Sequence, residues 1–205
     1  MKKIYIHGLG QTSEIWNKVI QKTGSAEQSI CPNLSELVNE KEVNYKNLYQ
    51  GFSDFCDKTE GMLDLCGLSL GGVLALNYAI DHPKKVHSLV LIGTQYKMPK
   101  GLLRFQNLLF CLMPQIAFEQ MGFQKKEFLK LCRSMMELDF ADRLGKITCP
   151  VLVVCGEKDS ANKKASMELE KQIEHAQIRM ITRAGHEVNA DVPEELANVL
   201  QEFWI

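Results

Sequence analysis

The segment Gly67-Leu68-Ser69-Leu70-Gly71 fits the pattern G-x-S-x-G, which is typical of a nucleophilic serine at a sharp turn between a strand and a helix. An apolar run at 62–66 precedes it, and a strongly apolar helical pattern at 71–81 follows it. Glycine at both ends lets strand and helix pass closely, so that the Ser69 hydroxyl projects above the sheet. The helix start would add N–H groups and positive potential there. The alternative is a glycine-rich turn in which Ser69 only caps the helix.

A serine hydroxyl needs a base to remove its proton, and His186 is the candidate. It stands in Ala184-Gly185-His186, just after the strand expected at 178–181, so it occupies a loop at a strand's carboxyl end. The alternative is a surface or capping histidine. The other histidines compete poorly: two flank the end of the helix after Ser69 and would face the opposite rim, one precedes its strand, and one is better placed to shape the turn at 8–10 (His82, His87, His175 and His7).

The histidine in turn needs a carboxylate that fixes its tautomer and stabilises the imidazolium form. Asp159 follows the strand expected at 151–155, again at a carboxyl end. Glu157 is closer to that strand but would point differently. Glu187 and Asp191 lie beside the histidine in sequence and are less able to turn back on it. The order Ser69, Asp159, His186 is the order that this kind of serine turn leads one to expect.

Elements that could position these residues alternate along the whole chain. Continuous apolar strands separated by helical patterns predict a parallel sheet covered on both faces, in a single domain over 1–205. All three candidates then share the edge at which open α/β sheets bind ligands. The expected strands are 3–7, 29–31, 62–66, 86–92, 151–155 and 178–181, and the expected helices are 13–22, 45–58, 71–81, 161–174 and 193–203.

The segment 99–144 interrupts this alternation. It holds at least two helical patterns, divided near Pro114, together with six of the nine Phe and four of the nine Met residues. One interpretation is a helical pair that belongs to the core. We favour a cap over a pocket, because an insertion between two sheet strands sits above the sheet. Phe118 and Met121 are the residues expected to face that pocket and bind substrate.

Composition excludes several classes of function. With 24 basic and 25 acidic side chains the net charge is −1, which argues against a nucleic-acid surface. The seven cysteines form no C-x-x-C pair and are typical of buried apolar residues in a reducing compartment, with no zinc site or other metal site expected. Neither a signal-peptide core nor a membrane-crossing run is evident, so we expect a cytoplasmic protein without a membrane partner.

Taken together, the chain resembles small members of the α/β-hydrolase fold. The motifs are His7-Gly8-Leu9-Gly10, Gly67-Leu68-Ser69-Leu70-Gly71-Gly72, Gly156-Glu157-Lys158-Asp159, and Ala184-Gly185-His186 followed by Pro193-Glu194-Glu195. The resemblance implies a triad of Ser69, Asp159 and His186, an oxyanion hole from the N–H groups of Leu9 and Leu70, and a cap after 86–92. The family's first two strands are missing, so we expect six parallel strands in the family order 4-3-5-6-7-8, and a homodimer stays open.

The function that this resemblance implies is hydrolysis of a carboxylic ester, or a thioester, of a small and largely apolar substrate, through an acyl-enzyme and without a cofactor. Two alternatives remain. The same triad serves non-hydrolytic chemistry, such as the elimination of menaquinone-pathway synthases or the perhydrolysis of cofactor-free haloperoxidases. A multiply anionic substrate would need converging arginines, and only Arg104 and Arg133 lie in the expected cap. The other alternative is a non-catalytic binding module.

Overall fold

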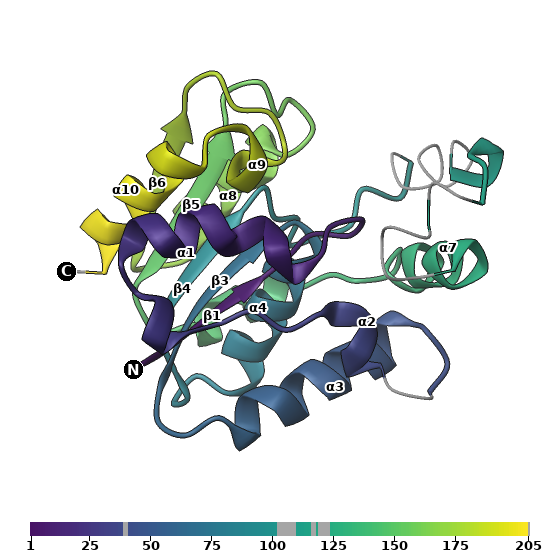
Figure 1. The fold of residues 1–205 in the computed structure, drawn as a ribbon, viewed down its shortest axis with the longest axis horizontal. Coiled ribbons are helices and arrows are strands. Elements are labelled where there is room, and N and C mark those ends of the chain that lie inside the picture. The colour runs from purple at the N-terminus through teal and green to yellow at the C-terminus, as the bar shows by residue number, and fades with distance from the viewer. Residues whose placement is uncertain (39–40, 102–109, 116–117, 119–123, 205) are drawn as a thin grey trace.

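A six-stranded parallel sheet organises the chain in the computed structural model, which describes residues 1–38, 41–101, 110–115, 118 and 124–204 (Figure 1). The strand order is β2-β1-β3-β4-β5-β6, and every neighbouring pair is parallel. This is the order expected from the sequence for a fold without the family's first two strands. The strands are β1 (Lys2–Ile6), β2 (Ser29–Ile30), β3 (Leu63–Leu68), β4 (Val86–Ile92), β5 (Val151–Gly156) and β6 (Ala176–Ile181).

Helices cover both faces of this sheet. The described helices are η1 (Ser13–Trp16), α1 (Asn17–Thr23), η2 (Ala26–Gln28), α2 (Leu34–Leu37), α3 (Tyr45–Lys58), α4 (Leu70–Asp81), α7 (Lys125–Ser134), η3 (Ala141–Lys146), α8 (Lys163–Gln172), α9 (Val188–Asp191) and α10 (Pro193–Phe203). None of them is long and apolar enough to cross a bilayer.

Alternate residues of the strands other than β2 serve two separate apolar cores, because successive side chains point to opposite faces of a sheet. In β1, Ile4 and Ile6 join the core beneath α3 and α4, whereas Tyr5 joins the core beneath α1 and α10. The middle strands β3, β4 and β5 are buried almost throughout, which is why their sequences are continuously apolar. These strands therefore lie between the two packed cores.

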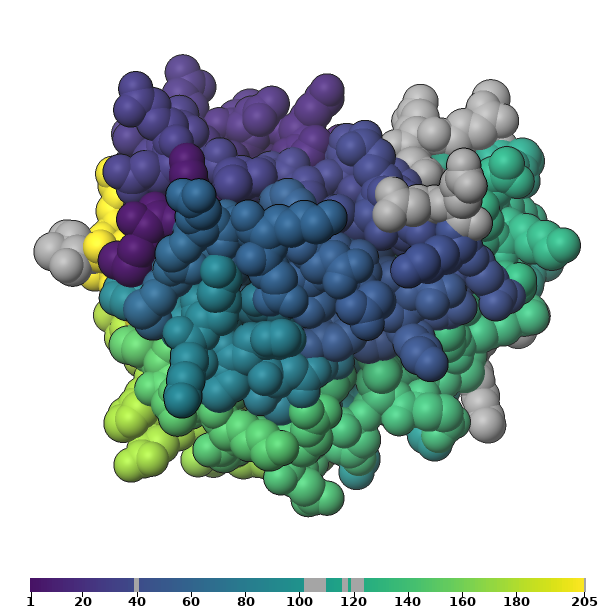
Figure 2. Space-filling model, turned by 90° about the horizontal axis from the view of Figure 1, so that it is seen from below, coloured from purple at the N-terminus to yellow at the C-terminus, as the bar shows by residue number. Residues whose placement is uncertain are grey.

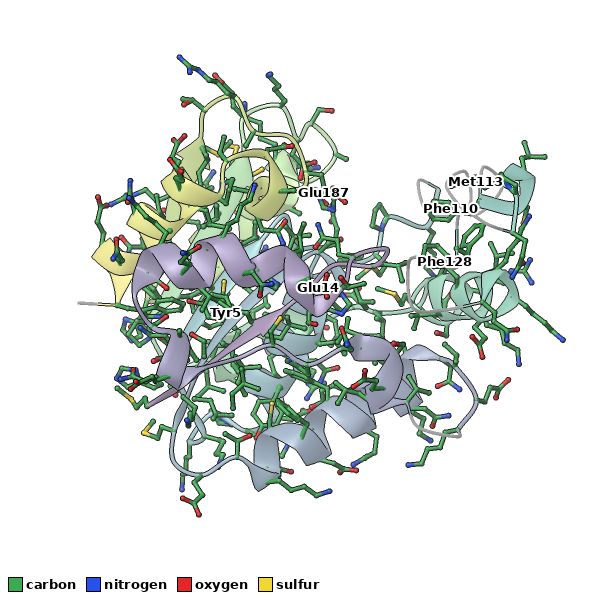
Figure 3. The ribbon with its side chains drawn as sticks, in the orientation of Figure 1. Tyr5, Glu14, Phe110, Met113, Phe128 and Glu187 are labelled. Carbon is green, nitrogen blue, oxygen red and sulfur yellow. The ribbon has the colours of Figure 1, made fainter. Side chains whose placement is uncertain are left out.

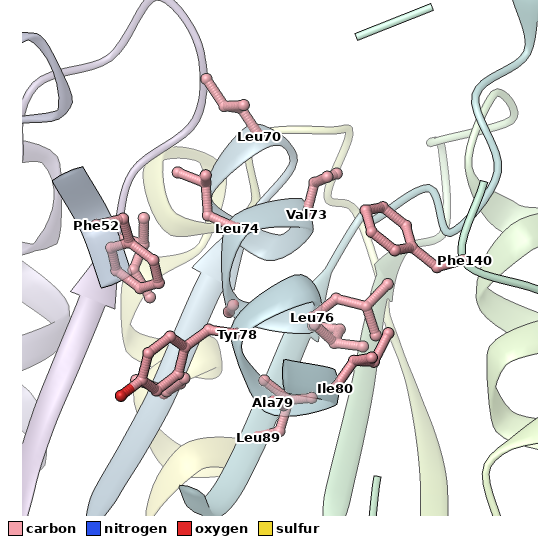
Figure 4. Close-up of a cluster of buried hydrophobic side chains, with 14 of the residues drawn as sticks. Phe52, Leu70, Val73, Leu74, Leu76, Tyr78, Ala79, Ile80, Leu89 and Phe140 are labelled. Carbon is pink, nitrogen blue, oxygen red and sulfur yellow. The ribbon is translucent and has the colours of Figure 1, made fainter. Parts of the chain in front are cut away.

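Helix α4 lies at the centre of the larger core (Figure 4). Eleven of its residues are buried, and its side chains point both towards the sheet, at Leu89, and towards neighbouring segments, at Phe52 and Phe140. A helix that is apolar all round is one buried on all sides. The turn that begins this helix is therefore firmly supported.

The chain between β4 and β5 leaves the sheet through a narrow neck. The two sides of the neck pair at Lys97 and Asp139, with flanking backbone bonds from Met98 N–H to the Leu138 carbonyl and from Phe140 N–H to the Tyr96 carbonyl. Beyond the neck, α7 lies past the carboxyl ends of the central strands, on the right of Figure 1. The excursion expected from the sequence at 99–144 thus corresponds to a segment that closes on itself at its base.

Contacts with α3 and with the loop before it fasten α7 to the body of the molecule. Tyr45 N–H donates to Ser134 Oγ at 2.8 Å, and Lys130 forms an ion pair with Glu42. Figure 2 shows the blue surface of α3 and its preceding loop continuing into the green surface of this segment. The position of α7 is therefore set by side-chain contacts as well as by the neck.

Several expected boundaries were wrong by a few residues. The strand expected to end at 66 continues to Leu68 because Gly67 and Leu68 still pair with Leu91 and Ile92 of β4. The helix expected at 13–22 divides into η1 and α1, and the helix expected at 161–174 is shorter at both ends. Strand β6 begins before the expected 178, at Ala176, because its edge position leaves polar and exposed residues in the strand.

Candidate active site

Ser69 occupies the sharp turn that joins β3 to α4. Its φ of 52° and ψ of −113° lie in a region that residues other than glycine rarely adopt, and such strain is concentrated at functional sites. The close passage that this turn requires explains the glycines: a Cβ on Gly67 would lie 2.3 Å from the Gly71 carbonyl oxygen. The first helical bond runs from Val73 N–H to the Ser69 carbonyl, so the earlier N–H groups of the helix point outward.

His186 and Asp159 meet across two different loops. The Asp159 carboxylate is buried, with its side chain 4% exposed, and its Oδ2 lies 2.8 Å from Nδ1 of the partly exposed His186. A carboxylate can only accept, so Nδ1 carries the proton and Nε2 is left as the acceptor. This is the tautomer that a general base acting on a hydroxyl requires.

The charge of Asp159 is stabilised by its hydrogen bonds. Burial alone would raise the pKa of Asp159, but hydrogen bonds from His186 and Asn162 outweigh burial and hold this pKa below its ordinary value. The group is therefore a carboxylate throughout the range in which an imidazole titrates. A fixed negative charge beside His186 stabilises the imidazolium form that appears during proton transfer.

Gly93, directly after β4, brings the serine turn and the Asp159–His186 pair together. Ser69 N–H donates to the carbonyl of Ile92 at 2.9 Å, so Ser69 is anchored to the residue before Gly93. On Gly93 itself, a Cβ would lie 2.9 Å from His186 Nδ1 and 3.1 Å from Asp159 Oδ2. His186 and Asp159 thus occupy the space that a side chain at position 93 would need.

Replacing Gly93 by alanine is expected to lower kcat/KM about 100-fold, because a displaced imidazole no longer aligns with its partners. Gly93 has a φ of +52°, so the change also strains the backbone. Gly24→Ala is the matched control, since Gly24 has a φ of +65° but nothing within 4 Å of an added Cβ. Steady-state kinetics should show the loss for Gly93→Ala only; equal losses would refute the steric explanation.

The loop after β1 lies against the serine turn. A Cβ on Gly71 would lie 2.2 Å from the Ile6 carbonyl oxygen, and one on Gly8 would lie 2.7 Å from the Leu68 side chain. Leu9, which is half-buried, follows directly in this loop, while Leu70 opens α4. The two residues expected to supply oxyanion N–H groups therefore belong to segments in van der Waals contact.

Buried polar contacts shape this loop. His7 Nε2 accepts from Leu34 N–H at 3.2 Å and its Nδ1 lies 2.9 Å from the Gly8 carbonyl; burial lowers the pKa of His7 despite the bond to Gly8. His7 thus shapes the turn as a neutral side chain, as its sequence position suggests. Gln11 Oε1 accepts from Gly8 N–H, and the amides of Gln11 and Asn189 bond reciprocally at 3.2 Å. This pair joins the loop to α9, just after His186.

The expected substrate-binding residues lie in the segment that carries α7. Phe118 is fully buried and stacks edge-on against Phe128, with ring centroids 5.1 Å apart. Phe110 packs on the same Phe128 ring at 5.0 Å, with Met113 beside it (Figure 3). Met121 lies outside the described residues. The described part of the segment is therefore built around an aromatic cluster.

The remaining candidates lie elsewhere. Glu157 and Glu187 are exposed, and Asp191 accepts from Gly185 N–H at 2.7 Å, which stabilises the histidine loop. His87 pairs with Asp64 at 2.8 Å near the amino ends of β3 and β4. Among the described residues, no three His, Cys, Asp or Glu side chains are grouped as metal ligands would be, and the cysteines are free thiols.

Sequence reasoning missed Gly93, Asn162 and the Gln11–Asn189 pair. Asn162 Nδ2 lies 2.8 and 2.9 Å from the two carboxylate oxygens of Asp159. The spacing of Asp159 and Asn162, just before a helix, was the available signal for that contact. Gly93 follows a strand as Ser69 does, but nothing local shows what occupies the space above it.

Comparisons with known proteins identify similar chains. A Bacillus subtilis protein provisionally named a 2-succinyl-6-hydroxy-2,4-cyclohexadiene-1-carboxylate synthase is 24% identical over 176 residues, which cover 68% of this chain and 64% of that protein. The Aeromonas hydrophila pimeloyl-[acyl-carrier protein] methyl ester esterase is 22% identical over 241 residues, covering 98% of this chain and 94% of the esterase. The chain thus spans slightly less than two thirds of the first relative and most of the second.

A solved structure shares the fold. The esterase from Thermogutta terrifontis superimposes with a TM-score of 0.80 at 19% identity, covering 100% of this chain and 89% of the esterase. The model of the alpha/beta hydrolase family matches residues 4–199. The chain, with its serine turn, buried acid and loop histidine, therefore belongs to the alpha/beta hydrolase family.

Proposed function

We propose that the protein hydrolyses a carboxylic ester or thioester of a small, largely apolar substrate through an acyl-enzyme. The observation that carries the proposal is a strained serine turn after β3 and, at the same edge of the sheet, an imidazole whose Nδ1 lies 2.8 Å from a buried carboxylate. A serine in that setting has a base for its proton and a fixed charge for the imidazolium that results. The esterase-named relatives support the same chemistry.

The reaction proceeds in two transfers. Ser69 Oγ attacks the acyl carbon while His186 Nε2 takes its proton, and the same proton then goes to the departing alcohol or thiol. Water, deprotonated by His186, cleaves the acyl-enzyme and restores the hydroxyl. The N–H groups of Leu9 and Leu70 hold the oxyanion in both steps; removal of one such donor typically costs about 10²–10³ in rate.

Because Asp159 stays ionised, activity should rise with pH as His186 loses its proton, and then level off.

A synthase that uses the triad for elimination is the second candidate, since one relative is named a synthase. A substrate with several carboxylates would need free cationic side chains above Ser69. In the described part of the segment beyond the neck, the basic groups are largely engaged: Lys97 with Asp139, Lys100 with Glu137, Lys125 with the carbonyls of Cys111 and Met113, and Lys130 with Glu42. Lys126 and Arg133 are exposed on α7, and Arg104 lies outside the described residues. This pairing favours a substrate of low charge.

Rapid mixing with p-nitrophenyl esters separates the two candidates. When the acyl-enzyme forms faster than it is hydrolysed, its formation releases a burst of p-nitrophenol equal in amount to the enzyme. We expect such a burst, which Ser69→Ala should abolish. An enzyme that forms 2-succinyl-6-hydroxy-2,4-cyclohexadiene-1-carboxylate but never acylates on Ser69 would contradict ester hydrolysis.

Acyl-chain length tests the role proposed for the segment 99–144 as a cap. Each methylene buried against its aromatic cluster should add up to about 0.8 kcal/mol, or roughly fourfold in kcat/KM, until the pocket is full. Efficiency should therefore rise from acetate to medium-chain p-nitrophenyl esters and then fall. Phe118→Ala should flatten the rise while acetate is still turned over.

Leu112→Ala is the matched control for this series, because Leu112 belongs to the same segment but is 77% exposed. Its chain-length profile should equal that of the wild type. A wild-type profile that does not depend on chain length would mean that the aromatic cluster is ordinary core packing, and the cap proposal would fail.

A further inference from the structure

Asn162 touches the acid of the candidate triad with a hydrogen-bonding group that the ester-hydrolysis mechanism does not yet use. Its Nδ2 lies 2.8 Å from Asp159 Oδ1 and 2.9 Å from Oδ2, and it also lies 3.1 Å from His186 Nδ1. Since Nδ1 carries a proton that goes to Asp159, Asn162 and His186 are both donors, and they converge on one carboxylate. Asn162 is 8% exposed, so water competes little for these bonds.

The orientation of the Asn162 amide is fixed by Gln95. Gln95 Nε2 donates to Asn162 Oδ1 at 2.9 Å and approaches the Ala161 carbonyl at 3.2 Å. Because the oxygen of Asn162 is held by this donor, the NH₂ group must face Asp159. Gln95 lies just before the neck from which the α7 segment departs, so the chain of contacts reaches from that neck to His186.

We propose that Asn162 is a positioning residue for the triad. Gln95 holds the Asn162 amide, and this amide orients the Asp159 carboxylate so that Oδ2 meets His186. The proposal rests on the proposed function. A carboxylate has two equivalent oxygens and can rotate. The Asn162 amide nitrogen lies 2.8 and 2.9 Å from the two carboxylate oxygens and 3.1 Å from His186 Nδ1, so it fixes the rotation of the carboxylate with Oδ2 beside the imidazole. Hydrogen bonds to a charged acceptor are short and strong enough to do this.

Asn162 also moderates the charge that His186 experiences. Its amide hydrogens partly offset the negative charge of the Asp159 carboxylate. Without them the carboxylate attracts the His186 ring more strongly in its protonated form, which favours imidazolium. The working base is neutral imidazole, so the free enzyme would then need a higher pH to become active. The surrounding elements also carry titratable groups, namely Cys155 on β5, Lys158 after it, Tyr96 before the neck, Lys163 on α8, and Glu187 and Asp191 after His186. All of these stay unchanged in the variants described next.

Asn162→Leu removes both amide N–H donors and keeps a branched side chain with the same number of non-hydrogen atoms. We expect kcat to fall about 10- to 100-fold, and the acid limb of kcat/KM to move about one pH unit upward. Gln95→Leu should shift the limb in the same direction by less, since the amide keeps its contact part of the time. In the double variant, Gln95→Leu should add nothing to Asn162→Leu, because it acts through that residue.

Ser160→Ala is the matched control, because Ser160 lies in the same loop, is neutral and is exposed; its pH profile should equal that of the wild type. An Asn162→Leu protein that folds and keeps both the wild-type kcat and the wild-type acid limb would overturn the proposal. If Asn162→Leu does not fold, Gln95→Leu decides, and an unshifted limb contradicts the role. Additive effects in the double variant would mean that Gln95 does not act through Asn162.

A titration that needs no substrate separates this proposal from ester hydrolysis. In protein labelled with ¹⁵N-histidine, the ring signals of His186 should titrate at a higher pH in Asn162→Leu than in the wild type. That shift is expected whatever ester is cut. A wild type that cleaves no ester, with the shift still present, would refute the proposed function but not the positioning role of Asn162. An active esterase without the shift would refute the positioning role but not the proposed function.

Discussion

Replacing Ser69 by alanine is expected to lower kcat for ester hydrolysis about 10⁶-fold, because loss of the nucleophile costs as much as loss of the whole triad. The turn stays favourable for folding, since alanine removes only one oxygen from a residue whose backbone is set by β3 and α4. KM should change little. The rate measured with a p-nitrophenyl ester, compared with the uncatalysed rate, tests this directly.

Ser53→Ala controls for the loss of a buried hydroxyl. Ser53 is 6% exposed on α3, where its Oγ lies 3.4 Å from His82, far from the carboxyl ends of the strands. It should keep wild-type kinetics. Residual activity above about 1% in Ser69→Ala, with a clean Ser53→Ala control, would mean that another group attacks the ester.

Replacing Asp159 by asparagine is expected to lower kcat about 10⁴-fold, because an amide can stabilise the wrong tautomer of His186 and carries no charge for the imidazolium. The fold should persist, because asparagine has the same shape. Thermal unfolding should confirm this, while steady-state kinetics record the loss.

Asp64→Asn is a closely matched control, since Asp64 is also buried and also pairs with a histidine at 2.8 Å, but at the other end of the strands. It should alter stability without lowering kcat. A large loss of kcat in Asp64→Asn, together with near-normal activity in Asp159→Asn, would mean that Asp159 is not the working acid.

Much of the site follows from local sequence because its residues each follow a strand. Ser69, Asp159 and His186 stand just after β3, β5 and β6, and parallel strands bring their carboxyl ends to one edge. The parallel sheet itself is evident in the continuous apolar runs of β3, β4 and β5, which are covered on both faces. The contact between His186 and Asp159 is what such a pattern leads one to expect.

Other features depend on contacts between distant segments and leave little local signal. The space above Gly93 is defined by groups 66 and more residues away, and the Gln11–Asn189 pair spans 178 residues. Helix α2 has four residues, too few for a helical periodicity. The Asn162 amide is directed by Gln95, whose sequence neighbourhood indicates only a connection between two elements.

Covalent labelling tests the central claim, that Ser69 is a nucleophile activated by His186, most directly. The protein is treated with a fluorophosphonate, and intact mass and peptide mapping are recorded for the wild type, Ser69→Ala and Ser53→Ala. We expect one adduct, located on Ser69, in the wild type and in Ser53→Ala, and none in Ser69→Ala. An adduct that persists in Ser69→Ala, or a wild type that stays unlabelled, would contradict the claim.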